Sequence, residues 1–154
     1  MRYFVFLFFF AFLLINGCNK ALTGNIVSDQ YPYENIKTQV YFCPRDDCSK
    51  IIKDVVNNTE KSAHCAFFDL DLEDLITMIA KKSHSADVKV VIDDGNYDGQ
   101  IEGEGVRIAK SKQYMHNKFC IIDNNKVITG SMNPTERDSK FNNNNLIIIN
   151  SKYI

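Results

Sequence analysis

The stretch that decides the fold is residues 116–123, His-Asn-Lys-Phe-Cys-Ile-Ile-Asp, which is followed after six residues by Gly130-Ser131-Met132-Asn133. Side chains of a strand point alternately to the two faces of a sheet, so His116 and Lys118 are predicted to project to the same face. The pair Asn124-Asn125 predicts a hairpin turn, and the returning strand would bring Ser131 and Asn133 beside them. An imidazole, an ammonium, a hydroxyl and an amide would then converge, a combination that suits a phosphate group.

Basic residues precede this stretch. Residues 105–122 contain no Asp or Glu but include Arg107, Lys110 and Lys112. The whole chain has 18 basic and 19 acidic residues, a net charge of −1, so it has no general attraction for polyanions. Lys110 and Lys112 are therefore candidates for local binding of a polyanionic substrate. The alternative, an exposed strand edge protected by lysines, stays open.

The pattern His-x-Lys-x4-Asp-x6-Gly-Ser-x-Asn resembles the signature of the phospholipase D superfamily. Residues from about 38 to 150 are similar to its small bacterial endonuclease-like branch, which carries a single motif. The strand at 88–93 before a Gly-rich loop, and the strand at 63–68 leading into a helix, match that branch. The resemblance implies an α/β sandwich, in which helices flank a mixed β-sheet, and chemistry that needs no metal or other cofactor.

The resemblance also implies catalytic roles. His116 would attack phosphorus and form a phosphohistidine, while His116 of a second copy would protonate the leaving oxygen. Lys118 and Asn133 would hold the phosphoryl oxygens with help from Ser131. Asp123 would support these residues without contacting the substrate itself. The chain has one such motif and no internal repeat, so a homodimer is expected to complete the active site.

Two departures from the family stand out. The family often carries a glutamate just before the last strand, and Asn144 occupies its position here. An amide can still hydrogen-bond an imidazole, so Asn144 is a candidate binding residue. The terminal helix that usually covers the sheet is missing before Ile154. The chain is therefore either an active enzyme or an impaired remnant, a truncated copy that only binds phosphate.

The order of strand and helix patterns agrees with this fold class, because strands and helices alternate and then give way to a run of strands. Strands are expected near residues 38–42, 63–68, 88–92, 106–109, 117–123, 126–129 and 144–150. Helices are expected from Asp47 or Ser49 to about residue 61, and after Asp69. The acidic group from Asp69 to Asp74 suits a helix start better than a metal site.

The N-terminus predicts export. Met1-Arg2 precedes an apolar run from Tyr3 to Ile15, which is too short to span a bilayer. Residues 1–17 fit a signal peptide. Cys18 lies where a lipoprotein signal would place its lipidated cysteine, although plain cleavage or an uncleaved anchor would also fit. Residues 19–37 are expected to be a tether and residues 38–154 the phosphodiesterase domain.

The remaining four cysteines have two different kinds of surroundings in the sequence. Cys43 and Cys48 are close enough in sequence to form a disulfide after export. A single pair at this spacing is a weak zinc signal, and no metal site is expected. Cys65 and Cys120 lie within apolar strand patterns and are expected to be small buried thiols.

The sequence therefore predicts an exported, metal-independent phosphodiesterase, most simply an endonuclease. Hydrolysis of phospholipids is the alternative, since a lipidated N-terminus would anchor the protein to a membrane. A nucleoside triphosphatase is not indicated, because the Gly-x-x-x-x-Gly-Lys loop is absent from the sequence.

Overall fold

The computed structural model describes residues 34–154. The predicted signal peptide, Cys18 and the tether up to residue 33 lie outside the described residues. The folded unit begins before the predicted boundary at residue 38. Glu34 accepts hydrogen bonds from the Ser151 hydroxyl at 2.5 Å and from the Lys152 backbone at 2.9 Å. The last residues of the predicted tether are therefore fastened to the C-terminal end of the domain.

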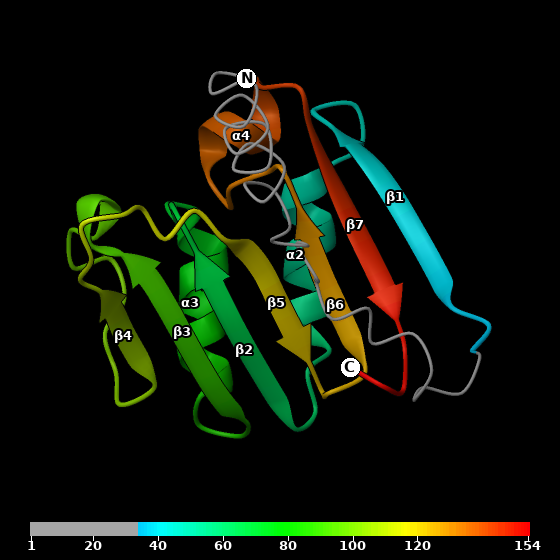
Figure 1. Ribbon diagram of the computed structural model, residues 1–154, viewed down its shortest axis with the longest axis horizontal. Helices are drawn as coiled ribbons and strands as arrows, with labels where there is room; N and C mark the ends of the chain where they lie inside the picture. The colour runs from blue at the N-terminus through cyan, green and yellow to red at the C-terminus, as the bar shows by residue number, and fades with distance from the viewer. Residues whose placement is uncertain (1–33) are drawn as a thin grey trace, which may run out of the picture. The chain divides into compact units, whose positions relative to one another are not determined.

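A seven-stranded mixed sheet forms the centre of the unit, with strand order β1-β7-β6-β5-β2-β3-β4 (Figure 1). The strands are β1 Lys37–Cys43, β2 Ser62–Phe67, β3 Asp87–Asp93, β4 Val106–Ala109, β5 Lys118–Ile122, β6 Lys126–Gly130 and β7 Asn144–Asn150. Strands β2, β3 and β4 are parallel, whereas β5, β6, β7 and β1 pair antiparallel, β5 lying against β2. The predicted mixed α/β sheet is confirmed.

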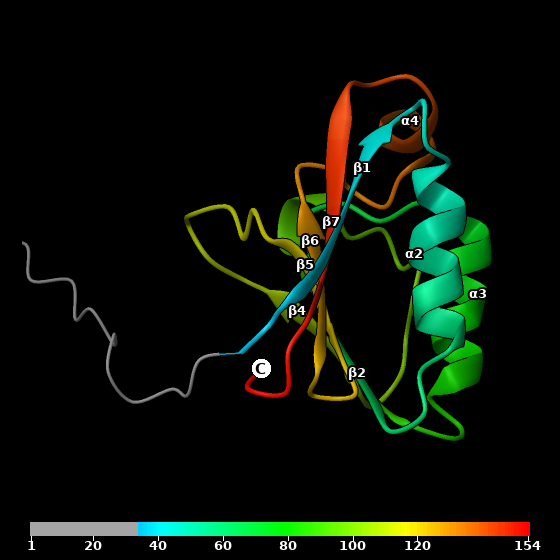
Figure 2. The same ribbon diagram turned by 90° about the vertical axis from the view of Figure 1, so that its right-hand side faces the viewer.

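The helices α2 (Cys48–Asn57) and α3 (Glu73–Lys82) pack side by side on one face of this sheet (Figure 2). Their buried side chains include Ile52 and Val56 from α2 and Leu75 and Ile79 from α3. These apolar residues recur on one side of each helix, and the core lies between that side and the sheet. None of the helices within residues 34–154 has the length and apolar character needed to cross a bilayer.

The other face of the sheet carries no helix within the described residues, as Figure 2 shows. Its side chains include Val40 and Phe42 of β1, which are 49% and 52% exposed. Strand β7 is the last regular element before Ile154. The sandwich expected from the family resemblance is thus flanked by helices on one side only.

The prediction for the acidic group before α3 was partly wrong. Helix α3 begins at Glu73, and its N-cap residue Leu72 makes no side-chain cap hydrogen bond. Asp71 instead accepts a hydrogen bond from the backbone of Glu136 at 2.6 Å. Glu136 begins α4 (Glu136–Lys140), a short helix that the sequence patterns did not predict. Only the acids from Glu73 onward lie in the first turn of α3, where they favour the helix dipole.

Two disulfides connect the elements. Cys43–Cys48 joins the end of β1 to the start of α2. Cys65 of β2 and Cys120 of β5 lie directly opposite each other and are also bonded, so the prediction that they are free thiols was wrong. Their strands are neighbours in space although 55 residues separate the two cysteines. Strand patterns alone do not reveal which strands are neighbours.

Candidate active site

His116 lies in the segment that leads into β5, and the residues on both sides of it are fixed. The backbone N–H of Met115 donates to the carboxylate of Asp93 at 2.7 Å, and Asp93 is only 3% exposed. The backbone N–H of Phe68 donates to the carbonyl of Asn117 at 2.7 Å. The exposed imidazole is therefore held between the carboxyl ends of β3 and β2.

The ring of Phe68 brings His116 and Lys118 together. Its centroid lies 4.5 Å from that of the His116 ring, and the Lys118 ammonium lies 4.8 Å from it. The Lys118 ammonium also donates to the His116 carbonyl at 3.3 Å. Tyr114, which is 78% exposed, packs edge-on against Phe68 at 5.9 Å. An imidazole, a cation and two aromatic rings thus gather around Phe68. Figure 1 shows that β5 begins beside the end of β2.

The charge of Lys118 is influenced by its burial and by nearby acids. Burial lowers the pKa of Lys118 below the usual lysine value, while the carboxylates of Asp138 and Asp69 oppose that change. Burial, followed by the neighbouring charge of Asp71, raises the pKa of Asp69. Lys118 is therefore a partly desolvated cation, which strengthens its attraction for a phosphate oxygen.

Ser131 has a structural task that the sequence did not predict. Its hydroxyl donates to Asn144 Oδ1 at 2.9 Å and accepts from the backbone of Asn145 at 3.0 Å. The preceding Gly130 has φ +151°, and a Cβ there would lie 2.3 Å from the Asn145 carbonyl oxygen. The single hydroxyl hydrogen of Ser131 is thus used to fasten β6 to β7.

Asn144 is likewise engaged inside the protein. Its Oδ1 accepts from Ser131, and its Nδ2 donates to the backbone carbonyl of Asp138 at 3.3 Å. The structure therefore shows Asn144 orienting its neighbours, and no contact joins it to His116. A shallow hollow of about 340 Å³ lies beside this pair, lined by Phe42, Cys43, Ser131, Asn143, Asn144 and Asn145.

Asn133 is fixed by a buried carboxylate. Both its backbone N–H and its Nδ2 donate to Asp138 Oδ2, each at 2.8 Å. Asn142 Nδ2 donates to the other oxygen, Oδ1, at 2.6 Å. Burial alone would raise the pKa of Asp138, but these hydrogen bonds outweigh it and hold the pKa below the usual value. Asp138 is therefore ionised at neutral pH.

Asp123 does not lie at the site. It follows β5 at the end opposite Lys118, a separation of about 15 Å for five strand residues. Its carboxylate accepts hydrogen bonds from the backbones of Glu60, Lys61 and Ser62, at 3.1, 2.7 and 2.9 Å. The prediction that it supports the histidine from behind was wrong, because it instead binds the chain that enters β2.

The candidate binding lysines Lys110 and Lys112 are exposed on the segment between β4 and β5. Figure 2 shows that this segment stands out from the sheet on the side opposite the helices. It also carries Tyr114 and His116, so the basic residues and the imidazole share one loop.

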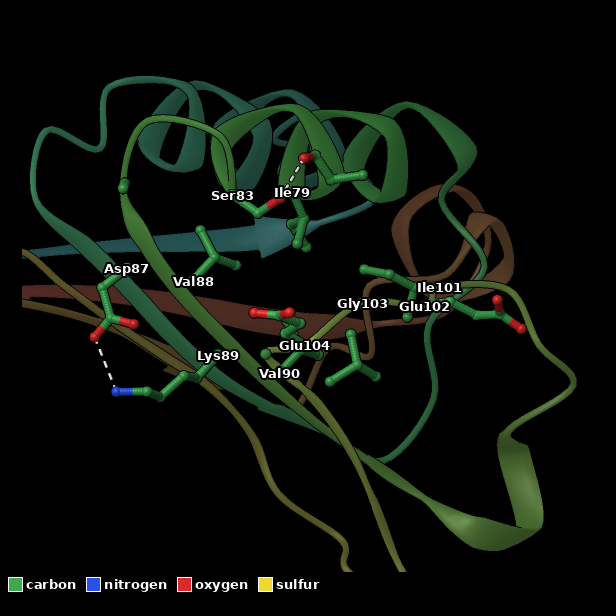
Figure 3. Close-up of a pocket in the computed structure, with 14 residues that line it drawn as sticks. Ile79, Ser83, Asp87, Val88, Lys89, Val90, Ile101, Glu102, Gly103 and Glu104 are labelled. Atoms are coloured by element: carbon green, nitrogen blue, oxygen red, sulfur yellow. Dashed lines mark hydrogen bonds and ion pairs between the residues drawn. The ribbon is translucent and has the colours of Figure 1, made fainter.

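A larger hollow of about 420 Å³ lies elsewhere, between α3, β3 and the loop before β4 (Figure 3). Its lining includes Ile79, Val88 and Ile101 together with Glu102 and Glu104. It contains none of the predicted catalytic residues. Within residues 34–154, no cluster of three or more His, Cys, Asp or Glu side chains could hold a metal ion.

Sequence reasoning missed four residues of the site: Phe68, Asp93, Tyr114 and Asp138. The position of Asp93 at the carboxyl end of β3 was a usable signal, since ligands often bind there. The partners of Phe68 and Asp138 depend on chain crossings and on α4, which strand patterns do not predict.

Known proteins are similar to this chain in sequence and in fold. "Phospholipase D" of Rickettsia bellii is 32% identical over 123 residues, which cover 73% of this chain and 61% of the relative. The chain thus spans about three fifths of the length of that relative. "Mitochondrial cardiolipin hydrolase" of Xenopus tropicalis is 37% identical over 81 residues, 46% of this chain and 39% of the relative.

Among solved structures, the phospholipase D family member Nuc from Salmonella typhimurium superposes with a TM-score of 0.68 at 24% identity. The match covers 77% of this chain and 85% of Nuc. NucT from Helicobacter pylori gives a TM-score of 0.58 at 18% identity, over 76% and 87% of the two chains. At these identities the structural likeness shows the shared fold. The family model described as "Cardiolipin synthase, PLD-like domain" matches residues 52–154, and the chain therefore belongs to the phospholipase D-like family.

Proposed function

We propose that this protein is a metal-independent phosphodiesterase that hydrolyses phosphodiesters through a phosphohistidine. The observation that carries the proposal is the joint placement of His116 and Lys118 on the ring of Phe68, at an exposed end of the sheet. The imidazole can attack phosphorus, and the ammonium can bind the oxygens on which negative charge develops.

The reaction has two steps. In the first, a His116 ring nitrogen bonds to phosphorus while the bond to the leaving oxygen breaks and the partner's His116 protonates that oxygen. In the second, the partner's His116 takes a proton from water, whose oxygen displaces His116 from phosphorus. Lys118 and the Asn133 amide stabilise the phosphoryl oxygens in both steps.

The active form is a two-fold homodimer in this proposal. One neutral imidazole cannot both attack phosphorus and protonate the leaving group in one step. The other histidines have different tasks, since His64 pairs with Asp87 at 2.9 Å and His84 contacts the end of α3. Two copies related by a two-fold axis would supply both imidazoles, and such axes are the commonest in homo-oligomers.

Nucleic acid is the preferred substrate class. Exposed lysines and an exposed aromatic ring occur together on the loop of His116, at Lys110, Lys112 and Tyr114. Single-stranded nucleic acids bind to sites that combine cations along the backbone with rings on which bases stack. A phospholipid is the second candidate, supported by the relatives named phospholipase D and cardiolipin hydrolase.

We also propose that the protein is exported, with Cys18 as a lipidation site that would anchor it to a membrane. The disulfides Cys43–Cys48 and Cys65–Cys120 support export, because disulfides persist in oxidising compartments. Mass spectrometry of the N-terminal peptide from cells that express the full chain tests lipidation, and a Cys18→Ser variant serves as the control.

The substrate experiment uses the purified full chain with excess EDTA. Single-stranded and duplex oligonucleotides, phosphatidylcholine vesicles, cardiolipin vesicles and a chromogenic phosphodiester are compared, with His116→Ala as the control. The expected result is His116-dependent cleavage of oligonucleotides, unaffected by EDTA. Loss of cleavage in EDTA, with recovery on adding a divalent ion, would contradict the mechanism. Cleavage of vesicles alone would instead establish the lipid alternative.

A further inference from the structure

We infer that Asp138 is a positioning residue of the proposed reaction, which sets the orientation of the Asn133 amide and places a fixed negative charge near Lys118. The inference rests on the proposed function. It assigns a task to a buried carboxylate that the two-step chemistry itself does not use.

The hydrogen bonds determine which way the Asn133 amide points. An ionised carboxylate only accepts hydrogen bonds, so the group that faces Asp138 Oδ2 at 2.8 Å must be the amide nitrogen. The Asn133 backbone N–H binds the same oxygen, which fixes the side chain from two directions. Nδ2 carries a second hydrogen, which the proposed reaction would use to bind a phosphoryl oxygen.

The oxygen of the Asn133 amide also indicates that Asp138 fixes the orientation of this side chain. Asn133 Oδ1 is buried and has no hydrogen-bond partner within the described residues. A free amide would rotate to satisfy this oxygen, because a buried unpaired acceptor costs free energy. The carboxylate of Asp138 prevents the rotation, since it would bring two acceptors together.

Asp138 also contributes charge to the site. Three ionisable groups from three parts of the chain influence one another here: Lys118 at the start of β5, Asp69 after β2 and Asp138 in α4. Each carboxylate favours the protonated form of the lysine, against the effect of burial. The other charged side chains of α4 are exposed, and Glu136 pairs with Lys140.

Asp138 lies close to Asn144, the residue at which this sequence departs from the family pattern. Members of the family often have a glutamate at the position of Asn144. The Asn144 amide donates to the Asp138 backbone carbonyl at 3.3 Å. The cluster around Asn133 therefore still contains a carboxylate, but α4 supplies it. A purely structural alternative is that Asp138 only fastens α4 to the end of β6.

The test compares Asp138→Asn with Glu136→Gln, which removes one charge from the same helix without touching Asn133. An asparagine at 138 presents its own N–H₂ to the donors of Asn133 or Asn142, so the Asn133 amide loses its fixed orientation. We expect kcat on a single-stranded oligonucleotide, the proposed substrate, to fall roughly 10- to 100-fold with little change in KM. Glu136→Gln should retain wild-type kcat.

The pH profile separates positioning from a structural role. Removing a negative charge near Lys118 disfavours its protonated form, so the alkaline decline of kcat should move to lower pH in Asp138→Asn. The decline should stay in place in Glu136→Gln. Wild-type kcat, or a lowered kcat with an unshifted alkaline decline, in folded Asp138→Asn would overturn the inference.

Folding and the proposed function are checked separately. If circular dichroism shows that Asp138→Asn is unfolded, NMR of the wild-type protein decides: the Asn133 side-chain amide signals should shift as Asp138 is titrated in acid. Signals that do not shift would overturn the inference. Failure of the proposed function would appear differently, as wild-type activity that persists in His116→Ala.

Discussion

The side chain of Phe68 holds the residues of the candidate active site together. Its neighbour Phe67 is fully buried in the core, whereas the ring of Phe68 contacts His116, Lys118 and Tyr114. A cation on the face of a ring is stabilised without a carboxylate partner, so its charge remains available to a phosphate. The aromatic ring thereby lets the site hold a lysine and an imidazole side by side.

Tyr114 offers a test of the substrate class. If a base stacks on its exposed ring, Tyr114→Ala should lower kcat/KM for a single-stranded oligonucleotide by about 5- to 150-fold, which corresponds to about 1–3 kcal/mol of stacking. Tyr114→Phe keeps the ring and should remain near wild type. Steady-state kinetics on the same oligonucleotide gives both values. Equal losses in the two variants would show that the hydroxyl, and not stacking, is responsible.

Asp123 should affect stability rather than chemistry. Burial alone would raise its pKa, but hydrogen bonds from the backbones of Ser62, Lys61 and Glu60 outweigh burial and lower the pKa of Asp123. Asp123→Ala leaves these N–H groups without their acceptor, so the free energy of unfolding at pH 7 should fall by about 1–3 kcal/mol. The kcat of the folded variant should be unchanged. Urea unfolding, with exposed Asp94→Ala as the control, measures the effect.

The pH dependence of this loss follows from the lowered pKa. The Asp123 carboxylate stabilises the fold at pH values above its unfolded pKa of about 4, and this contribution disappears as the pH falls through the lower folded value. The difference between wild type and Asp123→Ala should therefore shrink in acid. A difference that stays constant down to pH 2 would show that the charge of Asp123 is not involved.

Site residues were predictable from the sequence to the extent that their geometry is local. Lys118 begins β5 and His116 lies two residues before it, so the alternation of side chains along an extended segment suffices to place them together. The partners of Ser131 and Asp123 come from other segments, at Asn144 and at residues 60–62. Strand alternation contains no information on such contacts. The role predicted for Asp123 was therefore wrong, whereas the help of Ser131 in holding the phosphoryl oxygens stays a prediction.

At the scale of elements, strands and long helices were predictable because apolar periodicity reports burial. The start of α2 follows the predicted cap, since Asp47 accepts from the Lys50 backbone at 3.0 Å. Helix α4 escaped prediction because its five residues, Glu-Arg-Asp-Ser-Lys, contain no apolar side chain. Its position depends on tertiary contacts, among them the hydrogen bond between Asp71 and Glu136.

The Cys65–Cys120 disulfide yields a prediction for β2 and β5. The bond closes a loop of 55 residues, and the chain-entropy relation gives a stabilisation of about 4 kcal/mol. The double variant Cys65→Ala with Cys120→Ala should lose about 2–4 kcal/mol of unfolding free energy. Replacing Cys43 and Cys48 by alanine should cost less, because that loop is only five residues long.

Urea unfolding of the oxidised protein measures both losses. Reductant should lower the stability of the wild type and leave a variant without these four cysteines unchanged. Wild-type unfolding that is insensitive to reductant would show that the Cys65–Cys120 bond does not form.

At the scale of the whole molecule, the proposed dimer has a direct test. Differently tagged wild-type and His116→Ala chains are co-expressed, and the mixed dimer is purified through both tags. If both imidazoles are required, the mixed dimer should be nearly inactive. A mixed dimer with His84→Ala should keep full activity. A monomer with full turnover, identified by analytical ultracentrifugation at assay concentration, would contradict the proposal.

The pairing of β1 with β7 affects the order in which the sheet can form during protein synthesis. Within the described residues, the one strand that pairs with β1 is β7, from Lys37 opposite Asn150 to Cys43 opposite Asn144. While a ribosome makes the chain, β1 must wait for about a hundred residues before its partner emerges. The same strand brings Asn144 and Asn145 to Ser131, so the site and the sheet are completed together. A half-made chain therefore lacks the contacts that fix Ser131, and the proposed reaction is expected only after β7 has paired.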